Sequence, residues 1–341
     1  MLRKVNGRHR VTHVTTRVSL CAALLALAGA ARADDAAPAI PREALADAWW
    51  TGPLLAPNAS SFPAGHALIE PYVYDVINKG QYDASGHHEP AAGGHEVGSL
   101  TYLIYALTDR VSVGVLPRFA YDSPAGAPGS SAPGIGDFGA QVQFGLTSFH
   151  EGSWVPSTAV VVGETFPTGR YDRLTNTADG FGAGVYTTAF SWYSQDYLWM
   201  PNGRILRVRL DLTYAISSSA NVADQSVYAT PVGFRGHASP GDSFTADAAA
   251  EYSVTRNWVL ASDLIWVHNS STRVAGSEPA ATGPPLLFDT ESGSSEYLAV
   301  APAIEYNFTG AVGVIVGARI FVAGRNTGSS VTPVAAVNLV F

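Results

Sequence analysis

Residues Val331–Phe341 read VTPVAAVNLVF, and Phe341 is the last residue of the sequence. Counting back from Phe341 in steps of two meets only apolar residues, whereas the positions between them include Asn338. This alternation is typical of a β-strand with one more apolar face. Such a strand suits a transmembrane β-barrel, in which the last strand pairs with the first and a terminal aromatic lies in the interfacial girdle.

The same period of two recurs along the chain from residue 66 onward. Its clearest example is 206–216, where apolar residues alternate with Arg207, Arg209 and Asp211. We predict an all-β, antiparallel transmembrane barrel of about twelve strands, each long enough to cross a bilayer when tilted. The predicted strands are 66–77, 97–107, 111–121, 137–147, 155–166, 182–193, 204–216, 242–254, 258–268, 294–306, 311–323 and 331–341.

The connections between these strands alternate in length. Short ones cover 108–110, 148–154, 194–203, 255–257 and 307–310, and long ones cover 78–96, 122–136, 167–181, 217–241 and 269–293, with a shorter final loop at 324–330. An even strand count with short turns at one end and long loops at the other is typical of outer-membrane barrels. The alternative, a soluble β-sandwich, has no reason to separate its loops by length.

The first 33 residues have the pattern of a secretory signal. A basic stretch precedes the apolar run Val18–Gly29, and Ala31-Arg32-Ala33 supplies the small residues of a cleavage site. We therefore predict export with cleavage after Ala33, an N-terminal periplasmic segment at 34–65 and the barrel at 66–341. Within 34–65, Pro41–Ala48 predicts a short helix, and the whole segment is a candidate plug for the barrel.

Composition narrows the function classes. Removing the signal takes away six basic residues and no acid, so the formal charge falls from −8 to −14 and Lys79 is the single lysine left. Such a chain is a poor nucleic-acid binder, because phosphate contacts dominate that binding. The one cysteine, Cys21, lies in the signal, which excludes disulfides and cysteine-ligated metals from the mature protein. No cofactor is predicted.

Ionisable residues on the strands should point into the lumen, because charges on the lipid face are costly. The predicted lumen-lining residues are Glu70, Arg118, Asp137, Glu164, Arg207, Arg209, Asp211, Asp247, Glu251, Asp263, Glu305 and Arg319. With eight acids and four arginines, such a lumen would favour cations or neutral solutes over anions. Several of these residues fall on consecutive strands, so cross-strand ion pairs are expected.

Each of three loop motifs has both a functional and a structural interpretation. Gly134–Gly139 matches a dinucleotide fingerprint, but it opens a strand rather than a helix, so a tight loop-to-strand turn is the better interpretation. The loop that begins at Pro167 contains the constriction candidates Arg170, Tyr171, Asp172 and Arg173; it is either solvated or folded inward over the pore. His87, His88, Glu89, His95 and Glu96 have no metal-ligand spacing, and no metal site is predicted.

The sequence contains no G-x-S-x-G and no H-E-x-x-H motif, and we predict a protein that is not an enzyme. The rival is a lipid-acting barrel hydrolase with a Ser–His pair near the outer rim, for which His268 is the candidate. A structural or adhesive barrel without transport is the other alternative.

Four stretches in a fixed order resemble a known family. They are 49–57 (WWTGPLLAP), 65–72 (GHALIEPY), 134–137 (GIGD) and 166–172 (FPTGRYD). They are similar to the outer-membrane transporter family named for the meta-pathway of phenol degradation. This resemblance implies a barrel that passes small, often aromatic, compounds, and it supplies no catalytic residues.

The resulting prediction is a porin-like outer-membrane channel of a Gram-negative bacterium. It would pass small solutes, including hydrophobic or aromatic compounds, through a narrow lumen, since a twelve-stranded barrel encloses only a modest space. Its partners would be outer-membrane lipid and lipopolysaccharide, the solute itself and the barrel assembly machinery. The last of these follows from the resemblance of Phe341 to the terminal aromatic of other outer-membrane barrels.

Overall fold

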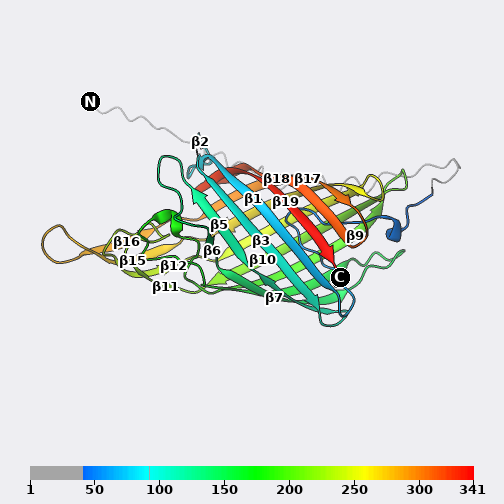
Figure 1. Ribbon diagram of the computed structural model, residues 1–341, viewed down its shortest axis with the longest axis horizontal. Coiled ribbons are helices and arrows are strands. Elements are labelled where there is room, and N and C mark those ends of the chain that lie inside the picture. The colour runs from blue at the N-terminus through cyan, green and yellow to red at the C-terminus, as the bar shows by residue number, and fades with distance from the viewer. Residues whose placement is uncertain (1–40, 92) are drawn as a thin grey trace, which may run out of the picture. The chain divides into compact units, whose positions relative to one another are not determined.

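The computed structural model describes residues 41–91 and 93–341, and the residues from Arg42 onward form one compact unit. Its main sheet closes on itself into an antiparallel barrel of twelve strands (Figure 1). The predicted signal at 1–33 lies outside the described residues, as do residues 34–40. No helix among the described residues is long and apolar enough to cross a membrane.

Ten of the twelve barrel strands are continuous, and each of the other two is interrupted and forms two shorter strands. The single strands are β1 (Ala67–Tyr82), β3 (His95–Ala106), β8 (Ser157–Phe166), β9 (Thr187–Trp199), β10 (Ile205–Ser217), β13 (Ser243–Ser253), β14 (Trp258–Asn269), β17 (Ser295–Asn307), β18 (Val312–Arg325) and β19 (Thr327–Val340). The broken ones are β4 (Val111–Leu116) with β5 (Arg118–Ser123), and β6 (Gly134–Ile135) with β7 (Phe138–Thr147). The first break falls at Pro117, which has no N–H to give to a ladder.

Strand β19 closes the barrel against β1, from Leu68 opposite Val340 to Tyr82 opposite Thr327. Beyond the ladder, the Phe341 N–H donates to Ala67 O at 2.9 Å, and the Ala67 N–H donates to Phe341 O at 3.1 Å. These bonds leave neither terminal strand with a free edge. The stretch 331–341 therefore closes the sheet as the sequence predicts.

Several element boundaries differ from the prediction. The expected final loop at 324–330 is a tight turn at Asn326, whose φ of 55° is left-handed, and β19 already begins at Thr327. Strand β9 runs over Thr187–Trp199 rather than 182–193, so the turn predicted at 194–203 is shorter. It begins late because the N–H groups of Gly182, Ala183 and Tyr186 bond to other loops instead of a strand. The helix predicted over Pro41–Ala48 is wrong in extent: one 3-10 turn, η2 (Leu45–Asp47), is formed.

The long loops also hold strands that were not predicted. A separate four-stranded sheet, here called the outer sheet, consists of β11 (Ala220–Ala223), β12 (Arg235–Ser239), β15 (Arg273–Glu278) and β16 (Leu286–Glu291) in that order. It extends beyond the barrel at the end opposite the C-terminus (Figure 1). A short strand, β2 (His88–Pro90), pairs with the end of β1.

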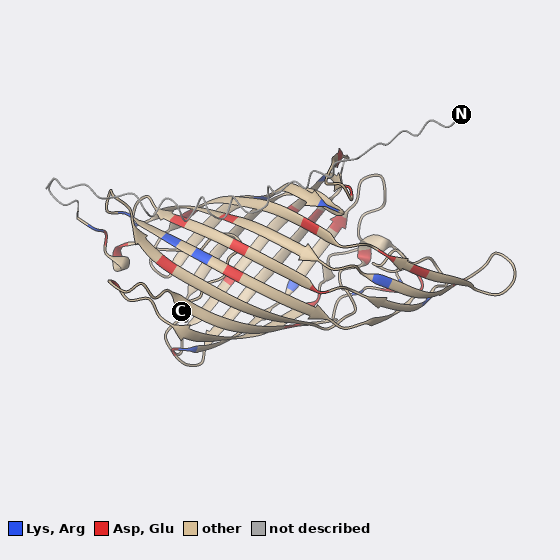
Figure 2. Cartoon of the chain, turned by 180° about the vertical axis from the view of Figure 1, so that it is seen from behind, with Lys and Arg blue, Asp and Glu red and all other residues tan. Residues whose placement is uncertain are grey.

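The barrel wall is apolar outside and polar inside. Large apolar side chains are exposed at alternate strand positions; examples are Val160, Val162, Leu210, Leu260, Ile304 and Val316. The positions between them are buried, and many of them are charged, as the red and blue bands on neighbouring strands show (Figure 2). This inverted pattern is that of a transmembrane β-barrel, whose outer face contacts lipid.

Candidate functional site: the barrel lumen and residues 50–61

Residues 50–61, here called the lumen segment, lie inside the barrel. Leu54, Ala56 and Ala59 are 3%, 3% and 1% exposed, although none of them belongs to a strand or helix. A buried loop must find partners for its backbone groups. In this protein those partners are charged and polar side chains of the barrel wall.

Asp263 on β14 holds the middle of the lumen segment. Its Oδ2 accepts the N–H of Leu54 at 3.1 Å, and its Oδ1 accepts the N–H groups of Leu55 at 3.3 Å and Ala56 at 3.0 Å. Two strands away in the same row of the wall, Arg209 Nη1 donates to Ala56 O at 2.6 Å. Charged partners make these hydrogen bonds stronger than bonds between neutral groups.

Glu305 on β17 holds the beginning of the segment. Its Oε2 accepts the N–H of Thr51 at 2.7 Å and that of Gly52 at 3.3 Å. Asn307, two residues further along the same strand face, accepts from the Thr51 hydroxyl at 2.9 Å. A Cβ on Gly313 would collide with that hydroxyl, so the glycine makes room for the segment.

An apolar socket receives one side chain of the segment. Leu54 packs with Ala301, Ile315 and Ala336 in a buried cluster. A Cβ on Gly317 would lie 2.6 Å from Leu54 Cδ1, so a glycine is needed at that point of the wall. Small wall residues therefore create a space that the leucine fills.

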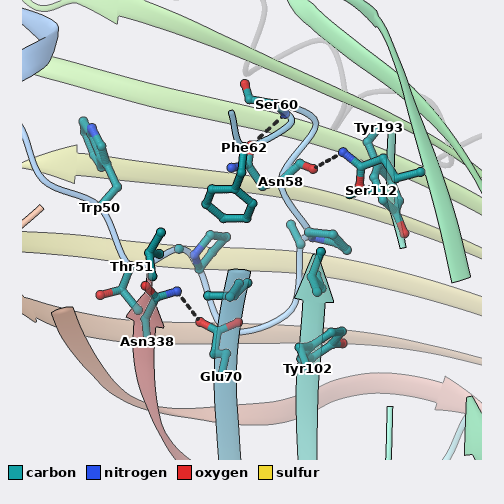
Figure 3. Close-up of a pocket in the computed structure, with 18 of the residues that line it drawn as sticks. Trp50, Thr51, Asn58, Ser60, Phe62, Glu70, Tyr102, Ser112, Tyr193 and Asn338 are labelled. Atoms are coloured by element: carbon teal, nitrogen blue, oxygen red, sulfur yellow. Dashed lines mark hydrogen bonds between the residues drawn. The ribbon is translucent and has the colours of Figure 1, made fainter. Parts of the chain in front are cut away.

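The end of the segment is held by amide side chains. Gln143 Nε2 donates to Asn58 O at 3.1 Å, and Gln195 Nε2 lies 3.4 Å from the Ser60 hydroxyl. Asn58 also accepts from the Ser60 N–H at 2.8 Å, which tightens the chain into a turn (Figure 3). The segment thus touches strands on several sides of the lumen.

Both flanks of the segment are fixed at the turn end of the barrel. Before it, Glu43 receives bonds from Trp199 Nε1 on its backbone O and Arg204 Nη1 on its carboxylate, each at 2.9 Å. Trp49 follows, with the Arg256 guanidinium 4.4 Å from its ring centre. After the segment, the Ala64 N–H donates to Asp109 at 2.9 Å.

A buried ion network stands beside the segment. Glu251 on β13 accepts from Arg207 Nε at 2.6 Å and from Arg207 Nη2, and Arg209 Nε lies 3.2 Å from the same carboxylate. The Arg207 guanidinium lies 4.6 Å from the ring centre of Trp50. Since Arg207 and Glu251 face each other across the ladder, the strand register creates this pair.

A cavity of about 340 Å³ remains between the lumen segment and the wall. Figure 3 shows Glu70 on β1 bonded to Asn338 on β19, at 3.1 Å, with Tyr102, Ser112 and Tyr193 around the same space. The Tyr72 and Tyr102 rings meet edge to face at 5.8 Å. This space is amphipathic and adjoins the segment that would have to move to widen it.

The twelve predicted lumen residues do not form one group. Eight are buried: Glu70, Arg207, Arg209, Asp211, Asp247, Glu251, Asp263 and Glu305. Asp137, Glu164 and Arg319 are half-buried and Arg118 is exposed. Asp137 accepts the N–H groups of Gly169 and Ala183, and Glu164 accepts the Thr188 hydroxyl, so these two acids hold an outer loop and a neighbouring strand.

Asp211 and Asp247 face each other directly across the β10–β13 ladder. They are 4% and 5% exposed, and both oxygens of Asp211 and one of Asp247 have no hydrogen-bond partner among the described residues. Like charges at opposed positions destabilise a sheet. The charges of these two carboxylates are therefore poorly compensated by hydrogen bonds.

Three of the four constriction candidates, Tyr171, Asp172 and Arg173, lie against the outer sheet. Tyr171 OH donates to Asn221 O at 3.0 Å, and the Asp172 carboxylate accepts the Ala223 N–H at 3.0 Å. Arg170 O accepts the N–H groups of Phe181 and Gly182, whereas the Arg173 N–H donates to Ala223 O. A pore-narrowing role for this loop stays a prediction.

The remaining candidates are separate from the lumen. His95 lies 3.1 Å from Asp75, and no group of three or more His, Cys, Asp or Glu placed to hold a metal occurs in the described part of the chain. His268 shares the outward face of β14 with Trp266 and lies 4.0 Å from Glu296. No serine hydroxyl is hydrogen-bonded to it within 41–91 and 93–341.

Sequence reasoning missed the polar residues without charge. Gln143, Gln195, Asn307 and Asn338 hold the lumen segment or Glu70, yet only charge was used to choose lumen residues. Gln143 does occupy a lumen position in the period-two pattern of 139–146. Applying the same alternation to amides would have found it.

No protein-family model and no curated protein sequence matches the chain. Among solved structures, it is similar to the COG4313 outer membrane channel from Pseudomonas putida F1, with a TM-score of 0.64 and 17% identity over 84% of this chain and 100% of that chain. This likeness shows that the two chains share a β-barrel fold. Membership of the phenol meta-pathway family stays a prediction.

Two further solved structures are similar to the chain only at low TM-scores. The β domain of the Bordetella autotransporter BrkA has a TM-score of 0.42 at 10% identity, over 82% of this chain and 100% of that chain. The toluene transporter TbuX of Ralstonia pickettii has a TM-score of 0.34 at 9% identity, over 82% and 90%.

Proposed function

We propose that this protein is an outer-membrane channel for small solutes that the lumen segment closes at rest. The observation that carries the proposal is the set of three backbone N–H groups, of residues 54–56, bonded to the buried carboxylate of Asp263. These hydrogen bonds all come from the lumen segment, so in an empty pore Asp263 would lose the partners that compensate its buried charge. The protein would be exported by residues 1–33 to the outer membrane of a Gram-negative bacterium.

The contacts of the segment suit a removable plug. Three contacts are apolar or aromatic: Leu54 in its socket, Ala59 against Val161 and Tyr193, and the Trp50 ring beside Arg207 and Tyr197. The other contacts are hydrogen bonds that water or a polar solute can replace. The flanking anchors at Glu43 and Ala64 hold the segment close to its site after release. Opening would therefore be a local rearrangement between fixed ends rather than expulsion of the N-terminal region.

The cargo follows from lumen chemistry and from the family resemblance. An excess of acids over arginines would favour cations or neutral solutes, and the resemblance adds hydrophobic or aromatic compounds. Reversal potentials in asymmetric KCl test the first point, with cation selectivity expected and anion selectivity contradicting it. No residue is assigned a role in making or breaking bonds.

Substitution of Asp263 tests the plug. Asp263→Ala removes the acceptor of three N–H groups, so we expect more frequent and larger openings in planar bilayers. Asp75→Ala, an acid on the outward face of β1, is the matched control and should leave conductance unchanged.

A disulfide lock gives the opposite test. The mature chain is free of cysteine, and the Thr51 and Asn307 side chains are in contact, so Thr51→Cys with Asn307→Cys would tie the segment to β17. We expect the oxidised variant to stay closed and reductant to restore openings. Equal conductance in the oxidised, reduced and Asp263→Ala proteins would contradict the proposal.

Assembly of the barrel is proposed to depend on Phe341. This side chain is 66% exposed, and only its backbone groups take part in closure of the sheet. Deleting Phe341 should lower the amount of protein in the outer membrane while the molecules that insert keep the parental conductance. Unchanged membrane levels would refute its role as a signal for the assembly machinery.

A further inference from the structure

A depression of about 540 Å³ lies on the outer loops, away from the lumen. Residues 171–173 form one side of it, and β11 and β12 form the other through Asn221, Ala223, Arg235 and His237. Asn221 faces His237 across the ladder and Ala223 faces Arg235, so these positions share one face of the outer sheet. Nothing in the proposed channel function uses this surface.

Hydrogen bonds give the depression a fixed floor. The Ala223 N–H donates to the Asp172 carboxylate, and the Arg173 N–H donates back to Ala223 O, each at 3.0 Å. The Leu174 N–H donates to Gln225 O at 2.9 Å, so residues 171–174 run along the free edge of β11. The side chains at the rim are therefore carried by paired backbone rather than by a free loop.

Two residues of this region have left-handed backbones although neither is glycine. Arg173 has φ 52° and Asp224 has φ 57°. The Asp224 N–H donates to Phe234 O at 2.9 Å, and its carboxylate accepts the Gly233 N–H at 3.0 Å. Unfavourable conformations that the surroundings enforce are often found at binding sites. Here the enforced backbone places Arg173 at the rim of the depression.

The depression is locally basic in an acidic protein. Arg173, Arg235 and His237 line it, whereas its one acid, Asp172, is bonded to the Ala223 N–H. Arg173 forms no ion pair within the described ranges. Arg235 gives one guanidinium nitrogen to Asp224 at 3.2 Å, and with 63% of its side chain exposed it keeps further donors for a ligand.

We propose that this depression is an oxyanion site that binds a phosphate group. The planar guanidinium groups of Arg173 and Arg235 can each bind two phosphate oxygens. The Asn221 amide and the His237 ring add further hydrogen-bond donors. The outer leaflet and the medium both supply such groups, as phosphorylated lipopolysaccharide headgroups and as free phosphate esters. The shared chemistry is the doubly charged phosphate monoester.

Binding of inorganic phosphate to the refolded full-length mature protein in detergent tests the site. Isothermal titration should detect phosphate binding to the parent, at least tenfold weaker binding to Arg173→Gln and no detectable binding to Arg173→Gln with Arg235→Gln. Arg273→Gln is the matched control, since Arg273 lies on the outer sheet but pairs with Asp289 and does not line the depression. Heat-modified migration on gels verifies that every variant is folded.

Two competition arms identify the source of the phosphate. Lipopolysaccharide with intact phosphates would displace inorganic phosphate if the headgroup is the ligand, whereas dephosphorylated lipopolysaccharide would not. Displacement by a sugar phosphate alone would assign a soluble ligand, and either result supports the site. Absence of phosphate binding to the parent, or equal binding to parent and double variant, would overturn it. These outcomes are independent of conductance, so failure here leaves the channel proposal intact.

Discussion

The lumen and the outer sheet bury opposite kinds of side chain. Around the lumen segment, fully buried positions are occupied by Glu251, Asp263 and Glu305, each at most 1% exposed. In the outer sheet the buried cluster consists of Val185, Ala220, Val222, Phe234, Ala238 and Val274, with no charge among them. Charges are on the exposed face of that sheet, as in a water-soluble protein.

The reason is the solvent on the outer side of each region. The barrel wall must present hydrocarbon to lipid, so its polar residues have only the lumen to occupy. The outer sheet has water around it and buries its apolar face, to which Phe288 of β16 contributes, against Tyr171 and Tyr228. One chain therefore follows two burial rules, and the change occurs where the barrel strands end.

The two regions consequently differ in what a lost side chain costs. A charge removed from the lumen leaves its partner buried without compensation. An apolar group removed from the outer sheet leaves a cavity. The first loss affects the whole barrel, whereas the second is confined to a small sheet outside it.

The largest effect is expected for Glu251→Ala. This change leaves Arg207 and Arg209, which are 4% and 6% exposed, without their shared carboxylate. Breaking a buried pair in this way costs about 3–5 kcal/mol. Urea unfolding in lipid vesicles, followed by tryptophan fluorescence, should show this loss of stability. Arg273→Gln, which breaks an exposed pair, should leave the stability nearly unchanged.

The next effect in size is expected for Phe234→Ala. Phe234 is 0% exposed and its ring meets that of Phe288 at 5.2 Å. Truncating a buried phenylalanine costs about 3–5 kcal/mol, and here the loss should stay within the outer sheet. Limited proteolysis should cut β12, β15 and β16 while the barrel keeps its unfolding midpoint. Val232→Ala, at a position 72% exposed, should remain resistant; a lowered barrel midpoint would mean that the regions are coupled.

Strand periodicity predicted the barrel but not the outer sheet. Each barrel strand contrasts hydrocarbon with polar residues, whereas β11 and β12 are short and rich in Ala, Gly and Ser, which also form loops. For the same reason, the sequence predicts a loop at 324–330. Their strand character comes from pairing with β1, a contact between distant parts of the chain.

The candidate site was predictable in its charges and not in their partners. Asp263 and Glu305 stand out as acids on apolar strands, but the groups they bond are backbone N–H groups, which every residue has. Nothing in the letters GPLLAP specifies that residues 54–56 bond Asp263. Small wall residues such as Gly313 and Gly317 are the nearest signal, and their meaning depends on knowing what fills the space.

A smaller effect is expected when the apolar anchor of the lumen segment is shortened. Leu54→Ala empties the socket formed with Ala301, Ile315 and Ala336, which costs the docked state about 2–5 kcal/mol but leaves the wall intact. Openings in planar bilayers should become more frequent without a change in barrel stability. Leu55→Ala, at the half-buried neighbouring position, is the matched control and should have a weaker effect. Identical traces for both variants would place the closing contact elsewhere.

The smallest effect is a dependence of the outer loops on pH. Bonding to the Gly233 N–H and to Arg235 lowers the pKa of Asp224 below its ordinary value of 3.8, the Ser131 N–H and hydroxyl lower the pKa of Asp179, and Arg273 lowers that of Asp289. A carboxylate whose pKa is lower in the folded state stabilises that state fully above 3.8. This contribution disappears as the pH falls through the folded pKa values.

Acid should therefore loosen the outer sheet before the barrel. Hydrogen exchange, corrected for its intrinsic pH dependence, should reveal weaker protection of the amides of β11, β12, β15 and β16 at pH 3 than at pH 5, with little change in the β13–β14 ladder. Asp224→Asn keeps a side chain that tolerates the left-handed backbone and removes the charge, so part of the pH dependence should disappear. Equal loss of protection in the β13–β14 ladder would show that the outer sheet has no separate acid sensitivity. In that case the boundary between the two burial rules would not be a boundary in stability, because the outer sheet and the barrel would open as one cooperative unit.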